Sequence, residues 1–240
     1  MIKIYICTPS PIYLQIENME IISTGYKKLD DALGGGLIKG STNLVIEDPE
    51  CLGDIFLVSL LKRRVAYGDT GLVDCFSYPP AELKRRCKKY DIDLYKYPRS
   101  ICFINLSSIE KIQLAFDLKD LSNFADRYVS VVSKLFLRPN IFNIVLSFTA
   151  FTIMFGEEQV YNHLIKDLKT YEAYKRTAVY LIQRPNHTED YVNKLKPLCS
   201  SVIVLKHSNT YGNVAIIEKS PLPYTSYPLP YRAKERMTRI

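Results

Sequence analysis

Residues 22–46 read ISTGYKKLDDALGGGLIKGSTNLVI and carry most of the information about the fold. Leu29 and Leu33 lie four residues apart, so they fall on one face of a short helix. The three glycines that follow permit backbone conformations with positive φ and a close approach to a neighbouring sheet. The stretch ends in a mostly apolar run, 42–46, which predicts a buried core strand.

Strand-like and helix-like segments alternate around this stretch, which predicts an α/β sheet with crossover helices. Further strands are expected at 72–76, 101–106, 142–148, 178–182, 201–205 and 213–218. Residues 1–11 are expected to form a first strand rather than a signal peptide. Helices are expected at 54–67, with Asp54 as the cap, and at 79–89, 160–171 and 188–198. A further helix is expected after a capping box formed by Ser107 and Glu110. Its apolar face would contain Leu121, Phe124, Tyr128, Val131 and Leu135.

The composition is that of an ordinary globular protein. The chain has 240 residues, of which 47% are hydrophobic and 24% charged, values that argue against a disordered chain or a coiled coil. No run approaches ~18 consecutive apolar residues, so no membrane association is expected. The six cysteines form no CxxC pair and several lie in apolar runs, as buried free thiols do, which favours a reduced, cytoplasmic setting without a metal site. The net charge of +7 is compatible with nucleic acid or an acidic protein as a partner.

The opening stretch resembles that of the RecA/RadA/KaiC-like ATPases, in which T-G-x-x-x-L-D-x-x-L-G-G-G-x-x-x-G precedes the first core strand. The matching positions are Thr24, Gly25, Leu29, Asp30, Leu33, Gly34, Gly35, Gly36 and Gly40. Weaker matches at 81–86 and 201–205 extend the resemblance over roughly residues 20–220. It implies an α/β fold with a RecA-like mixed, mostly parallel sheet and helices on both faces. We expect one core domain, 1–220, whose first 20 residues are a strand or extension, and a Pro/Tyr-rich basic tail, 221–240.

The loop after the core strand departs from the family. There the strand runs into GxxxxGK[ST], whose backbone amides, lysine and hydroxyl hold phosphates and Mg²⁺. Here the loop is Glu47, Asp48, Pro49, Glu50, Cys51, Leu52, Gly53 and Asp54. Two like charges about 4 Å apart repel by ~4 kcal/mol at an effective dielectric of ~20. We therefore expect this acidic loop to repel a nucleoside triphosphate.

Other catalytic parts of the family are missing as well. No carboxylate follows the strand at 144–149, where the family keeps an aspartate for Mg²⁺, and none follows the strand that ends at Phe76, where it keeps a glutamate. Gln183 matches a position that senses the γ-phosphate in relatives, and Lys219 matches a lysine presented across a subunit boundary. The resemblance thus implies a degenerate member without catalytic residues, metal or cofactor, in which Gln183 and Lys219 are remnants.

Two basic segments are candidate nucleic-acid or partner surfaces. The first contains Lys84, Arg85, Arg86, Lys88 and Lys89, and its alternative interpretation is a solvated helix face. The second contains Arg232, Lys234, Arg236 and Arg239, and its alternative is simple disorder. A doubled PLPY sequence, at 221–224 and 228–231, is either a docking peptide or a wrap along the edge of the domain.

The chain most resembles the archaeal RadA paralogues and KaiC-like proteins. The resemblance implies an inactive accessory or scaffold protein that assists DNA recombination or repair, with an active RecA-like ATPase or a second copy of itself as partner and DNA as a further contact. Two alternatives keep the same fold. One is a protein-interaction or regulatory module without DNA, KaiC- or FlaH-like, and the other is a weak ATP binder with an unconventional loop.

Overall fold

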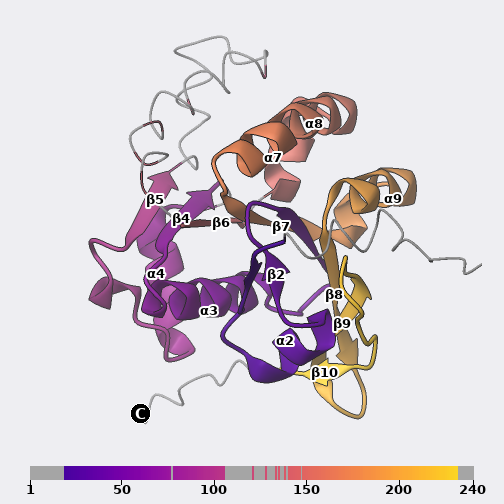
Figure 1. Cartoon of the computed structure of the whole chain (residues 1–240), viewed down its shortest axis with the longest axis horizontal. Helices are drawn as coiled ribbons and strands as arrows, with labels where there is room; N and C mark the ends of the chain where they lie inside the picture. The colour runs from indigo at the N-terminus through magenta and orange to yellow at the C-terminus, as the bar shows by residue number, and fades with distance from the viewer. Residues whose placement is uncertain are drawn as a thin grey trace, which may run out of the picture.

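An eight-stranded sheet forms the centre of the computed structural model, which describes residues 19–76, 78–105, 121, 128, 133, 135, 138, 140–146 and 148–231 (Figure 1). In spatial order the strands are β10 (Leu229–Pro230), β9 (Gly212–Lys219), β8 (Ser201–Ser208), β3 (Thr42–Glu47), β7 (Thr177–Gln183), β6 (Ile141–Val145), β4 (Thr70–Cys75) and β5 (Ile101–Asn105). The strands from β8 to β5 run parallel, while β9 and β10 run antiparallel to their neighbours. The expected α/β class with a mixed, mostly parallel sheet is confirmed.

Helices cover both faces of the sheet (Figure 1). One face packs against α2 (Lys27–Leu33), α3 (Gly53–Ala66) and α4 (Pro80–Lys89), and the other against α7 (Phe148–Phe155), α8 (Glu157–Ala173) and α9 (Glu189–Leu198). Successive residues of a strand point to opposite faces of the sheet. In β3, Val45 packs in the core that contains α3, whereas Leu44 and Ile46 pack in the core that contains α8. The central strands are therefore apolar on both faces, as parallel strands between two helix layers require.

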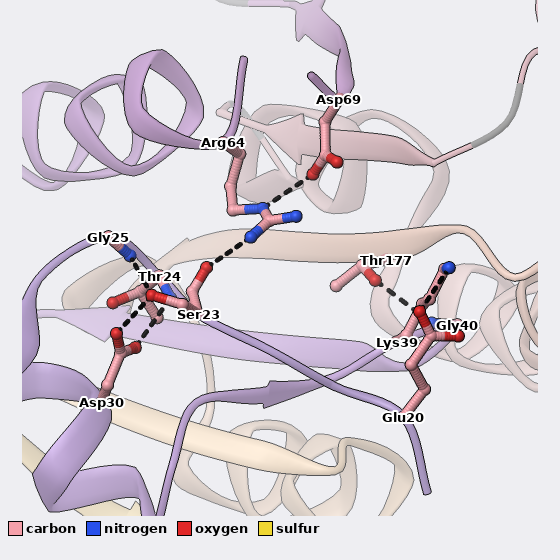
Figure 2. Close-up of polar contacts among 10 residues, drawn as sticks. All are labelled: Glu20, Ser23, Thr24, Gly25, Asp30, Lys39, Gly40, Arg64, Asp69 and Thr177. Carbon is pink, nitrogen blue, oxygen red and sulfur yellow. Dashed lines mark hydrogen bonds and ion pairs between the residues drawn. The ribbon is translucent and has the colours of Figure 1, made fainter. Parts of the chain in front are cut away.

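The Asp30 carboxylate organises the segment that precedes the core strand (Figure 2). It accepts hydrogen bonds from the backbone amide of Thr24 at 2.7 Å and from the Ser23 hydroxyl at 2.6 Å. The Arg64 guanidinium donates to the Ser23 carbonyl at 2.7 Å and to Asp69 at 2.7 Å, which ties the segment to α3 (Figure 2). In this chain the Thr-Gly-x-x-x-Leu-Asp motif therefore has a structural role.

Two of the motif glycines occupy positions that a side chain would not fit. Gly34 ends α2 with φ +83°, the left-handed conformation that favours glycine at a helix end. Gly36 has φ +141°, and a Cβ there would collide with the Ile22 carbonyl. This close approach lets β1 (Ile21–Ile22) pair with β2 (Leu37–Ile38) as a small antiparallel ribbon.

The strand expected at 142–148 is wrong at its end. β6 stops at Val145, and Phe148 already begins α7. The buried residues of α7 recur at helical spacing and are Phe148, Thr149, Phe151, Thr152 and Phe155. A continuous apolar run does not by itself distinguish a buried strand from a buried helix.

Several expectations lie outside the described residues. These are the strand at 1–11, the Ser107/Glu110 capping box, Phe124 and Val131, and the basic residues Arg232, Lys234, Arg236 and Arg239. Leu121, Tyr128 and Leu135 are described and are helical, as their spacing predicts.

Residues 221–231, which we call the C-terminal strap, lie along the domain. The backbone amide of Thr225 donates to the Ala32 carbonyl at 3.0 Å, and β10 pairs with the edge of β9. Leu222 and Leu229 are buried. Residues 221–231 therefore pack along the edge of the domain and are not a free docking peptide.

Candidate functional site

The turn between β3 and α3 is where the resemblance places a phosphate loop, and here a side chain of the protein fills that place. Glu47, the last residue of β3, is only 8% exposed. Its Oε2 accepts a hydrogen bond from the backbone amide of Gly53, the first residue of α3, at 2.8 Å. A Cβ at Gly53 would collide with this carboxylate and would lie 2.7 Å from Leu181 Cδ1. The amide at the N-terminus of α3, which could otherwise donate to a phosphate, is thus bonded internally.

The second oxygen of Glu47 contacts the neighbouring strand. Gln183, its register partner on β7, donates from Nε2 to Glu47 Oε1 at 3.1 Å. The Gln183 Oε1 accepts from Asn186 at 3.1 Å. Burial raises the pKa of Glu47, while the hydrogen bonds from Gln183 and Gly53, which favour the ionised form, oppose that shift.

The expectation that Asp54 caps α3 is wrong. The helix begins at Gly53, its N-cap residue is Leu52 with φ +54°, and no side chain bonds to the helix N-terminus from that position. Asp54 instead pairs with Arg86 of α4 at 2.6 Å and accepts from the Tyr78 hydroxyl at 3.1 Å. Glu47 takes over the capping role from the preceding strand.

The other acidic residues of the loop differ in their surroundings. Asp48 pairs with Arg184 at 3.3 Å, whereas Glu50 is exposed. Two of the four carboxylates, Asp48 and Asp54, therefore have an arginine beside them. The charge of the loop is thus offset at Asp48 and Asp54, whereas the Glu47 carboxylate occupies the N-terminus of α3.

The C-terminal strap closes the turn from outside. The Tyr231 ring packs against Phe56 of α3 with 5.1 Å between ring centroids, and its hydroxyl donates to the Cys51 carbonyl. Cys51 is fully buried, and burial raises the pKa of its thiol to about 11. Tyr231 is not among the residues predicted for this site, although the PLPY repeat marks its segment.

Lys219 does not face outward. Its Nζ donates to the carbonyls of Lys196, Pro197 and Cys199 at 3.1, 3.2 and 2.6 Å. These carbonyls lie at the end of α9, where the ammonium supplies hydrogen-bond donors and compensates the helix dipole. The Lys196 carbonyl also accepts from the Cys199 backbone amide at 3.3 Å. The Lys219 ammonium therefore bonds within its own chain.

Thr149, His187 and Glu157 form a chain of polar contacts that the sequence analysis did not identify. The His187 Nε2 lies 3.1 Å from Thr149 Oγ1, and its Nδ1 lies 3.3 Å from Glu157 Oε1. A hydroxyl, an imidazole and a carboxylate in this order also occur in nucleophilic enzymes. Here Thr149 is buried, and its hydroxyl oxygen already accepts from the backbone amide of Gln183 at 2.8 Å. The network ties the end of β7 to α7 and α8.

A second buried polar group lies on β4. Asp74 is 3% exposed and accepts hydrogen bonds from Tyr128 and from Asn143, each at 3.1 Å. Burial raises the pKa of Asp74 to about 6. A charged residue within an otherwise apolar strand was the available sequence signal.

The basic residues of α4 are only partly free to meet a partner. Lys84 lies over the Phe103 ring at 4.5 Å, Arg85 is 4.0 Å from Glu82, and Arg86 pairs with Asp54. Lys88 and Lys89 are exposed.

Within the described ranges, no group of three or more His, Cys, Asp or Glu side chains is placed to hold a metal ion. The helices described for this chain include none with the length and apolar character needed to cross a bilayer.

The fold is shared with a solved structure. A KaiC-like protein from the hyperthermophilic archaeon Pyrococcus horikoshii superposes with a TM-score of 0.65 at 17% sequence identity, over 88% of this chain and 94% of that one. No protein-family model matches the chain, and no curated protein does. The likeness confirms the RecA-like fold that the motif at 24–40 predicts.

Proposed function

We propose that this protein is a RecA-like accessory or scaffold protein that does not use nucleotide. The observation that carries the proposal is the hydrogen bond from the Gly53 amide to the buried Glu47 carboxylate. A triphosphate bound in the usual way would have to displace that carboxylate and then lie against it. The loop also lacks the lysine and hydroxyl that hold the outer phosphates and Mg²⁺.

The two remnant positions support the same proposal. Gln183 bonds to Glu47 and Asn186, and Lys219 bonds to the end of α9. Each side chain thus has an internal structural role that accounts for its presence. The function would then depend on surfaces, with an active RecA-like ATPase or a second copy of this chain as partner and DNA as a further contact.

Affinity capture from the native cell tests this role. Mass spectrometry of the captured proteins, with and without nuclease treatment, is expected to find a RecA-like ATPase or this chain itself in both preparations. Capture of neither, together with Mg²⁺-dependent ATP hydrolysis that substitution of Gln183 or Lys219 abolishes, would contradict the proposal.

A second candidate function is a protein-interaction or regulatory module without DNA. It is favoured by α4, where Lys84, Arg85 and Arg86 each contact a side chain of this protein. DNA binding that weakens as salt rises would decide against this candidate, because a surface that contacts phosphates must show that dependence.

A further inference from the structure

Two cavities lie next to each other on the helical face that carries α2, α3 and α4. The larger, about 610 Å³, is bordered by α2, α3 and the C-terminal strap. The smaller, about 370 Å³, is bordered by α3, the end of α4 and the 3₁₀ turn Leu94–Lys96. Lys62 and Asp91 line both, so the two cavities adjoin at these residues. We call the pair of cavities the lysine groove.

The lysine groove is positively charged. Five lysines line it, against two aspartates: Lys27, Lys28, Lys62, Lys88 and Lys96. Lys27 pairs with Asp31 at 3.3 Å. Among the residues that the structure describes, the other four lysines have no ion-pair partner. Several ammonium groups around a concave surface concentrate anions there.

The walls of the larger cavity are aromatic and apolar. Tyr26, Tyr90 and Tyr231 line it together with Phe56 and Ile92. The Arg63 guanidinium lies 4.0 Å from the centre of the Tyr26 ring, which holds that ring in place. The volume falls within the range of roughly 300–1,000 Å³ that is usual for small-ligand sites. Aromatic walls with a lysine rim suit a flat ring that bears phosphate.

We infer that the lysine groove binds nucleotide units of single-stranded nucleic acid, with phosphates at Lys28 and Lys62 and a base in the tyrosine-lined cavity. This inference rests on the DNA contact in the proposed function and gives it a location. The location differs from the turn at 47–54 and from the basic face of α4. The second cavity, which Lys62 also lines, offers room for a neighbouring nucleotide unit that an isolated nucleotide would not need.

Fluorescence anisotropy with labelled oligo(dT) of about 15 nucleotides tests the inference, since single-strand sites commonly span up to about 16. Lys62→Glu and Lys28→Glu are each expected to weaken binding at least about tenfold. The matched control is Lys166→Glu, because Lys166 is exposed on α8, on the other face of the sheet, and lines neither cavity; it is expected to change the affinity less than about twofold. Lys89→Glu probes the basic face of α4 separately. The salt slope should fall by about 0.7 for each phosphate that the variant no longer neutralises. Unchanged melting temperatures of the variants would exclude unfolding as the cause.

The competitors identify the ligand class. Displacement of the labelled oligo(dT) by unlabelled single strands supports the inference. Thymidine monophosphate, as a second competitor, shows whether a free nucleotide is enough to occupy the groove. Equal displacement by poly-glutamate would overturn it, because the groove would then select charge alone. If Lys89→Glu loses binding and Lys62→Glu does not, the protein still binds DNA, but through α4 and not through the lysine groove. If the unmodified protein does not bind oligo(dT), both the groove site and the DNA contact are excluded. The proposal that the protein does not use nucleotide is tested separately, by the MgATP titration.

Discussion

The carboxylate of Glu47 lies 2.8 Å from the backbone nitrogen of Gly53, at the N-terminus of α3. This geometry places a negative charge of the chain itself where the helix N-terminus would otherwise attract an anion. It also satisfies the first amide of a buried helix, for which Leu52 at the N-cap position offers no side-chain acceptor.

Removing this carboxylate should destabilise the protein. Glu47→Ala leaves the buried Gly53 amide and the Gln183 side chain without their acceptor, and we expect a loss of about 1–2 kcal/mol in the free energy of unfolding. Urea denaturation at neutral pH measures it. The exposed Glu50 in the same loop provides the control, and Glu50→Ala should change stability by no more than about 0.5 kcal/mol. Equal effects of the two substitutions would show that Glu47 has no capping role.

Lys219 should contribute to stability through the end of α9. Lys219→Met keeps the aliphatic stem but removes three hydrogen bonds to carbonyls, so we expect a loss of about 1–3 kcal/mol. Lys206→Met, at an exposed position on the adjacent strand β8, is the matched control and should be nearly neutral. Thermal and urea unfolding of both variants check this expectation, and a neutral Lys219→Met would contradict it.

Tyr231 should hold the C-terminal strap over the turn. Tyr231→Phe removes only the hydrogen bond to the Cys51 carbonyl and should cost about 1 kcal/mol. Tyr231→Ala also removes the ring from Phe56 and should cost about 2–4 kcal/mol. Cys51, now buried, should become reactive toward a thiol reagent in the alanine variant only, as peptide mass spectrometry would show. Labelling of Cys51 at the same rate in all three proteins would mean that the strap does not cover it.

Asp74 should make stability depend on pH. Its pKa is raised from an ordinary value of 3.8 to about 6, so the fold favours the protonated form. The stabilisation is fully present below pH 3.8 and is lost as the pH rises through about 6. A shift of about two units corresponds to ~3 kcal/mol. Asp74→Asn should therefore raise stability at pH 7.5 by up to about that amount, and it should flatten the decline of stability between pH 4 and 7.

The surroundings of Asp74 accommodate the amide. Asn143 now faces the Asp74 carboxylate through Nδ2 at 3.1 Å, and within the described residues its Oδ1 has no hydrogen-bond partner. Rotation of the Asn143 amide would therefore offer an acceptor to an amide at position 74. Asp31→Asn, at an exposed position of α2, serves as the control. A lower stability of Asp74→Asn at pH 7.5 would show that the ionised carboxylate is the favoured form.

The sequence predicts much of the fold because the deciding features are local. The motif at 22–46 and the alternation of apolar segments require only spacing, glycine positions and strand length. The prediction fails at Leu146 and Phe148, where a mostly apolar run passes from strand to helix and the periodicity is too short to show the change.

The candidate site is less predictable because its contacts join distant parts of the chain. Gln183 is 136 residues from Glu47 and Tyr231 is 180 residues from Cys51, yet both pairs are hydrogen bonded. Composition alone showed that the loop at 47–54 is acidic. It could not show that Glu47 turns inward, that Asp54 turns to Arg86 or that Lys219 bonds within its own chain, because those directions depend on the packing of strands and helices.

Binding of MgATP to the purified protein tests the central claim most directly. A thermal-shift titration, repeated by calorimetry, would detect a site, since a ligand at ~100 times its Kd adds ~2.7 kcal/mol to stability. We predict no saturable shift at millimolar MgATP in Lys62→Glu, in which the lysine groove is impaired and the turn at Glu47 is intact. A saturable shift that Gly53→Ala or Gln183→Ala abolishes would contradict the claim that Glu47 has replaced the phosphate.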